Sequence, residues 1–136
     1  MTSECSIPDD KLARLREVLG EEPRLAAVYA AGEYGVDTCD LAVLFSGTLP
    51  WSRRLELELA AAGALGLERV ELLNLRRMPL VHRFGVLHRN ELIYVGQPEE
   101  LAQFMEDTIA RYTAFYPLLE ALYWKTEVNP LADEQP

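Results

Sequence analysis

The spacing of apolar residues along the chain predicts eight elements in the order helix, strand, strand, helix, strand, helix, strand, helix. Apolar residues three and four positions apart indicate helices, and short apolar runs between turn residues indicate strands. Proline and glycine mark most of the boundaries. The helices are expected at 9–20, 51–66, 79–89 and 98–127, and the strands at 24–31, 38–46, 68–75 and 91–96.

The connection between the first two strands limits the topology. Only about six residues separate them, which is too short for a parallel crossover, so the two strands are expected to pair antiparallel. The third strand follows a helix, and the sheet is therefore expected to be mixed. The predicted fold class is α+β, a small mixed sheet flanked by helices in one domain spanning 1–136. Its core covers about 9–96, and the long C-terminal helix of 98–127 carries Pro117, which is expected to kink or divide it.

Composition narrows the function. The chain of 136 residues has 13 basic and 22 acidic side chains, a formal net charge of −9. Proteins that grip nucleic acid do so mainly with Lys and Arg, so direct nucleic-acid binding is not expected. An acidic surface suits solubility or a basic protein partner. Two cysteines, no signal peptide and no membrane-length apolar run predict a cytoplasmic protein without a membrane anchor.

The stretch VYAAGEYGVDTCDLAVLF (28–45) carries the candidate chemistry. It is a strand, a turn with two glycines, and a second strand with Asp40 near its start. This stretch, together with VELLNL (70–75) and the later LIYVG (92–96), resembles the minimal nucleotidyltransferases of the polymerase-beta type. In that family the first strand ends in Gly-Ser, the second begins Asp-x-Asp, and a third acid lies on the next strand.

The resemblance implies a site that is only partly present here. It places Asp40 on the second acid of Asp-x-Asp and Glu71 on the third acid, as candidate catalytic and metal-binding residues. The first acid falls on Thr38. The Gly-Ser pair falls on Ala30 and Ala31. Gly32, Gly35 and Thr38 are then the candidate nucleotide-binding residues, although Glu33 beside the glycines would repel a triphosphate.

The missing carboxylate matters because nucleotidyl transfer uses two magnesium ions about 3.5–4 Å apart. Residues 38 and 40 point the same way on a strand, so two acids there would share the ions. A threonine hydroxyl is a weak ligand for a hard cation. Asp37 faces the other side unless a bulge turns it back. Asp40 and Glu71 alone could hold one Mg²⁺ with ATP, so cofactor binding is expected to be weak or absent.

Simpler explanations exist for each candidate. Asp40 could be a strand-end residue bonded to turn amides, and Glu71 could face water on an edge strand. His82 and His88 are expected on the surface or in helix packing, and Arg53 and Arg54 on a solvated helix face. An aromatic stripe along the last helix is expected mainly in the core, with part of the helix available to another chain. It comprises Phe104, Ile109, Tyr112, Phe115, Tyr116, Leu119 and Tyr123.

The resemblance also implies a role. Family members are antitoxins that bind a helical HEPN-type toxin and transfer AMP from ATP to it. The first hypothesis is therefore an antitoxin that binds a HEPN-type partner and is catalytically impaired. The second is an active Mg²⁺-dependent adenylyltransferase, and the third is a nucleotide-sensing subunit of another complex. Homo-oligomerisation through the C-terminal helix remains open.

Overall fold

The structure, a computed structural model, describes residues 7–32 and 37–125, with the side chains of 119 and 123–125 excepted. All eight predicted elements are present. A short 3-10 helix that the sequence pattern did not predict, η1 (Leu75–Arg77), follows the third strand. The helices are α1 (Asp9–Leu19), α2 (Trp51–Leu65), α3 (Leu80–Arg89) and α4 (Pro98–Lys125), and the strands are β1 (Leu25–Ala30), β2 (Thr38–Phe45), β3 (Arg69–Asn74) and β4 (Glu91–Val95).

The four strands form one mixed sheet in the order β3-β2-β1-β4. β1 pairs antiparallel with both β2 and β4. β2 pairs parallel with β3, because α2 carries the chain back to the starting end of the sheet. The mixed sheet expected from the short first connection is therefore confirmed, and β3 and β4 are its edges.

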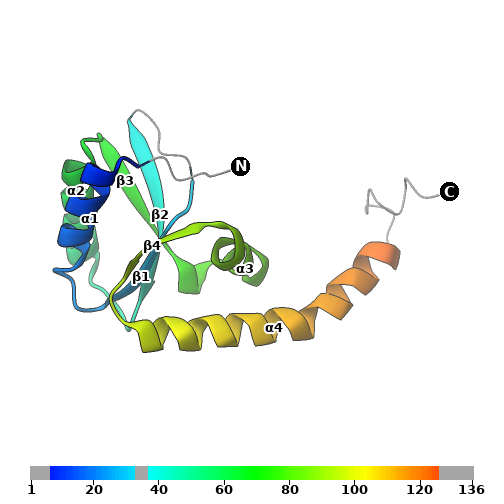
Figure 1. Ribbon diagram of the computed structural model, residues 1–136. Coiled ribbons are helices and arrows are strands. Elements are labelled where there is room, and N and C mark those ends of the chain that lie inside the picture. The colour runs from blue at the N-terminus through cyan, green and yellow to red at the C-terminus, as the bar shows by residue number, and fades with distance from the viewer. Residues whose placement is uncertain (1–6, 33–36, 126–136) are drawn as a thin grey trace.

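Helices cover both faces of the sheet, as Figure 1 shows. α1 and α2 lie on one face, where Leu15, Leu57 and Leu65 pack against Leu41 and Val43 of β2. α3 and α4 lie on the other. There the core is smaller and is made by alternating residues of the same strands together with α4. Its buried members are Ala26, Ala27, Tyr29, Ala42, Leu44, Leu75, Leu101 and Phe104.

Two glycines meet backbone requirements that other residues would not. Gly66 ends α2 with φ of 70°, the left-handed conformation that favours glycine after a helix. Gly96 joins β4 to α4, and a side chain there would collide with the carbonyl oxygen of Leu25. The second glycine therefore lets the start of α4 lie directly against the end of the sheet.

A buried ion pair ties the loop before β1 to α2. The carboxylate of Glu22 is only 2% exposed and accepts hydrogen bonds from Arg53 Nε at 2.8 Å and from Arg24 N at 2.9 Å. Burial alone would raise the pKa of Glu22, but the hydrogen bonds from Arg53 and Arg24 outweigh it and lower the pKa below 4.5. Arg53 is thus not on a solvated face as expected. Arg54 also has partners, because it donates to the carbonyl of Leu72.

Replacing the carboxylate of Glu22 should destabilise the folded chain. We expect Glu22→Gln to lower the free energy of unfolding by ~2–3 kcal/mol, since both arginines lose a hydrogen-bonded buried charge. The depressed pKa stabilises the native chain above pH 4.5, and this contribution is lost as pH falls through the lowered value. Urea unfolding between pH 3 and 7 measures both effects. Glu56→Gln, at a 67% exposed partner of Arg53, is the control and should change stability by less than ~1 kcal/mol.

The predicted aromatic stripe of α4 divides into a packed part and an exposed part. Phe104 is buried in the core, and the ring of Tyr112 stacks on Phe84 of α3 with centroids 4.0 Å apart. Ile109 and Tyr116 are 48% and 46% exposed, so the expectation that they belong to the core is wrong. Tyr116 lies beyond the contact with α3, whereas Ile109 lies between Phe104 and Tyr112 and is exposed all the same.

Pro117 lies inside α4 without dividing it. Figure 1 shows the helix running beyond the body of the domain and bending over its last turns. No helix within the described part of the chain is long and apolar enough to cross a membrane.

Candidate functional site

The exposed end of β2 carries the residues that the sequence singled out. Thr38 and Asp40 are exposed, whereas Cys39 between them is buried against the α1–α2 side. Side chains alternate along a strand, so Thr38 and Asp40 share the opposite face with buried Ala42. This is the face that α3 and α4 cover further along the strand. Here it is open to solvent.

The parallel register brings the second acid directly beside Asp40. Asp40 pairs with Glu71, and Thr38 pairs with Arg69. Neighbouring strands lie ~4.8 Å apart, and paired residues point to the same face. The two candidate metal ligands are therefore adjacent. Glu71 is also exposed on an edge strand, as the simpler explanation requires.

Arg69 is the residue at this site that sequence reasoning missed. It pairs with Thr38, the residue on which the resemblance places the first carboxylate of the family pattern. Thr38, Asp40, Arg69 and Glu71 thus form a patch of four side chains with two negative charges and one positive charge. No ion pair joins Arg69 to either acid within residues 7–32 and 37–125. Its charge nevertheless opposes a divalent cation placed beside Thr38.

The end of β1 completes one side of the patch. The amide of Ala31 donates to the carbonyl of Asp40 at 3.1 Å, so pairing continues past the last residue of β1. A Cβ on Gly32 would lie 3.9 Å from Asp40 Oδ2, which places this glycine beside the carboxylate. Asn90 Nδ2 donates to the carbonyl of Ala30 at 2.7 Å and fastens the end of α3 to the same strand end.

Two other predicted residues contribute less. The carbonyl of Asp37 accepts hydrogen bonds from the amides of Glu68 and Arg69, and β2 pairs with β3 from Thr38 to Val43 without a bulge. Strand alternation therefore leaves the side chain of Asp37 on the face away from Asp40. Gly35 lies outside the described residues. No side chain or amide of the described residues donates to the Asp40 carboxylate.

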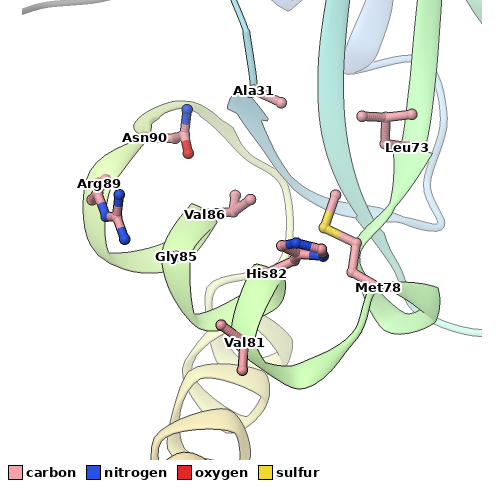
Figure 2. Close-up of a pocket in the computed structure, with 9 residues that line it drawn as sticks. All are labelled: Ala31, Leu73, Met78, Val81, His82, Gly85, Val86, Arg89 and Asn90. Atoms are coloured by element: carbon pink, nitrogen blue, oxygen red, sulfur yellow. The ribbon is translucent and has the colours of Figure 1, made fainter. Parts of the chain in front are cut away.

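A pocket of about 430 Å³ opens next to the patch, between the sheet and α3. Figure 2 shows its walls: Ala31 just after β1, Leu73 from β3, and His82, Arg89 and Asn90 among the residues of α3 and its end. Leu73 is two residues beyond Glu71 on β3, about 7 Å along the strand. The pocket and the patch therefore form one continuous surface.

The sequence held a signal for this pocket that was not used. Val81, Gly85 and Arg89 follow one another at four-residue intervals, and His82, Val86 and Asn90 do the same one position on. Residues three and four apart share a face of a helix. His82 was expected in a surface or packing role, and it lies at the surface as a wall of this pocket. His88 stacks on Phe84 instead, with ring centroids 5.7 Å apart.

The described residues of the patch supply few ligands for a pair of magnesium ions. Within the described residues, no group of three or more His, Cys, Asp or Glu side chains is placed to hold a metal. Asp40 and Glu71 supply two carboxylates, and Mg²⁺ bound through phosphates needs only one or two. The arrangement therefore suits at most one ion that a nucleotide brings with it.

Solved structures share this architecture. A chain of the MntA–HepT toxin–antitoxin complex is 26% identical, with a TM-score of 0.60 over 82% of this chain and 92% of that one. A chain from a complex of a tri-AMPylated Shewanella oneidensis HEPN toxin with an MNT antitoxin is 27% identical, with a TM-score of 0.62 and coverage of 82% and 92%. A further Shewanella oneidensis structure is 25% identical, with a TM-score of 0.61 and coverage of 85% and 95%.

The chain has the fold of the minimal nucleotidyltransferase antitoxins. No family model and no curated protein matches the sequence. The likeness therefore rests on structure, and it covers most of this chain and most of each similar chain. The minimal nucleotidyltransferase fold assigned from DLAVLF and the third strand is confirmed.

Proposed function

We propose that this chain is an antitoxin of the minimal nucleotidyltransferase type that binds a HEPN-type toxin and has lost efficient nucleotidyl transfer. One arrangement supports the loss of transfer: the resemblance places the first carboxylate on Thr38, and Arg69 pairs with this threonine on the neighbouring strand. The site has lost a negative charge and gained a positive one within one pair of residues. Both changes weaken a two-ion site.

The partner is supported by the similar structures and by α4. Two of the similar structures are toxin–antitoxin complexes, one of them with a HEPN toxin. On this chain, Leu118 and Leu122 of α4 are 57% and 51% exposed, and Phe115 precedes them at helical spacing. Figure 1 shows this part of α4 extending beyond the sheet. An apolar helix face of this kind fits a groove on a helical protein.

A nucleotide titration tests the impairment. We expect Mg²⁺ and ATP at 1 mM to leave the thermal unfolding midpoint of the isolated chain unchanged. A functional site at 100 times its dissociation constant would add about 2.7 kcal/mol. Labelled ATP incubated with the chain and its HEPN-type partner should then label neither protein. A Mg²⁺-dependent rise in the thermal midpoint that Asp40→Asn removes would contradict the impairment. Failure of the chain to bind a HEPN-type partner would contradict the antitoxin role.

The second candidate is a working adenylyltransferase, and the pocket beside Asp40 favours it. Arg89 and His82 line that pocket and have no hydrogen-bond partner among the described residues, so they could contact a nucleotide. Asp40 and Glu71 would hold Mg²⁺, which would neutralise charge on the phosphates. In this case AMP transfer to the partner should appear with ATP and Mg²⁺ and disappear in both Asp40→Asn and Glu71→Gln.

A further inference from the structure

A second polar cleft lies at the other end of the sheet from Asp40. Two adjoining cavities of about 380 and 350 Å³ share Arg54, Asn74 and Arg77 as lining residues. They lie where the parallel strands β2 and β3 end, at Phe45 and Asn74. Phe45 lies five positions after Asp40, about 16 Å along β2. Ligands commonly bind at the carboxyl ends of parallel strands.

The cleft is basic in an acidic protein. Arg54, Arg76 and Arg77 line it, and neither cavity has an acidic residue in its wall. Arg54 is paired with Glu58 at 3.7 Å, and Arg76 with Glu100 at 2.5 Å. The guanidinium of Arg77 is exposed and has no ion pair or hydrogen bond with any described residue. Arg77 therefore carries the uncompensated positive charge of the cleft.

Two neighbouring features add donors for an anion. The side-chain oxygen of Asn74 accepts from the amide of Arg76, which leaves the Asn74 NH₂ group as a donor. α2 begins beside the cleft at Trp51 with no side-chain cap and no acid in its first turn. The first amides of a helix lack internal acceptors and carry the positive end of its dipole. A phosphate in the cleft would meet arginine, amide and helix-end donors together.

An aromatic ring completes the cleft. The side chain of Trp51 lines the larger cavity and is 73% exposed, which is unusual for tryptophan. Phe45 and Leu49 line the same cavity. Bases stack on exposed aromatic rings, and arginine forks bind phosphate oxygens. The size is also within the range of small-ligand pockets, about 300–1,000 Å³.

We propose that this cleft binds a nucleoside monophosphate, with the phosphate held by Arg77 and the base stacked on Trp51. The nucleotide could be free or could be the 5′-terminal nucleotide of a short strand, since both present the same chemical group. The site is separate from the Asp40–Glu71 pair and needs no metal. It does not depend on the antitoxin role proposed above.

Tryptophan fluorescence of the isolated chain tests this site. The chain has two tryptophans, so Trp124→Phe leaves Trp51 as the single reporter. In EDTA, AMP should quench Trp51 saturably, and adenosine or inorganic phosphate alone should bind at least about tenfold more weakly. If a 5′-phosphorylated trinucleotide quenches Trp51 as strongly as AMP does, the cleft also accepts the 5′ end of a strand. Quenching by AMP alone assigns the free mononucleotide.

Arginine variants locate the phosphate. Arg77→Ala should weaken AMP binding by at least about tenfold, and Arg77→Lys should recover only part of it because lysine lacks the planar fork. Arg14→Ala, at an exposed arginine of α1 that lines neither cavity, is the matched control and should bind as the parent does. Circular dichroism checks that each variant is folded. Absence of quenching by both nucleotides, or equal binding by Arg77→Ala, would overturn the proposal.

Discussion

Thr38→Asp combined with Arg69→Ala should restore magnesium-dependent nucleotide binding to the chain. The first change places a carboxylate two residues from Asp40 on the same face, and the second removes the cation across from it. Each change should alter the interaction with a divalent ion by more than ~1.4 kcal/mol, a factor of ten. We therefore expect ATP to bind about a hundredfold more tightly in the presence of Mg²⁺ than it does to the parent chain. Isothermal titration calorimetry measures the difference directly.

The single variants separate the two contributions. Thr38→Asp alone should recover part of the affinity, and Thr38→Asn, which has nearly the same size without the charge, should recover none. In the absence of metal, three neighbouring carboxylates repel one another, so the double variant should be less stable than the parent and regain stability with Mg²⁺. Adding Asp40→Asn to the double variant should abolish binding. If the double variant binds ATP and Mg²⁺ no more tightly than the parent does, the charge of this patch is not what limits nucleotide binding.

The arrangement of elements could be predicted because each has a local signal. The strand of 38–46 is bounded by turn residues. The short connection before it predicts an antiparallel pairing, and β1 and β2 pair in this way from Leu25 to Ala30. Gly66 and Pro79 mark helix ends at or beside the observed ones. The short helix η1 was missed because Asn74 caps it with a single side-chain bond, which resembles an ordinary turn in sequence.

The register between β2 and β3 could not be predicted, and it determines the site. A helix separates the two strands in sequence, so nothing local shows that Thr38 pairs with Arg69 rather than with a neighbour. A slip of one residue would have placed Arg69 on the opposite face. The adjacency of Asp40 and Glu71 was expected from the family pattern, whereas the position of Arg69 required the structure.

Long-range ion pairs were also beyond sequence reasoning. Arg53 was expected on a solvated helix face, yet it reaches a glutamate 31 positions earlier. Similarly, the pattern in α4 is a continuous aromatic stripe, although the structure covers only the part near α3. Periodicity identifies the apolar face of a helix. It does not show how far the neighbouring elements extend along that face.

The exposed part of α4 should be essential for binding the toxin. Leu118 and Leu122 lie four residues apart and form one side of the helix beyond its contact with α3. Buried apolar anchors at an interface often contribute 2 kcal/mol or more each. Leu118→Glu would place a charge in such an interface, and we expect it to raise the dissociation constant for the HEPN-type partner about a hundredfold. Surface plasmon resonance with the immobilised partner measures this change.

A control on the far side of the same helix separates docking from general charge effects. Thr113 is exposed and lies five residues before Leu118, about 140° away around the helix axis. Thr113→Glu adds the same charge and should leave partner binding within about twofold of the parent. Neither variant should lower the thermal midpoint, because both side chains face solvent in the isolated chain. Light scattering distinguishes a self-association role, in which Leu118→Glu would reduce the mass of the isolated chain. Equal partner binding by the Leu118 variant and the parent would remove this part of α4 from the interface.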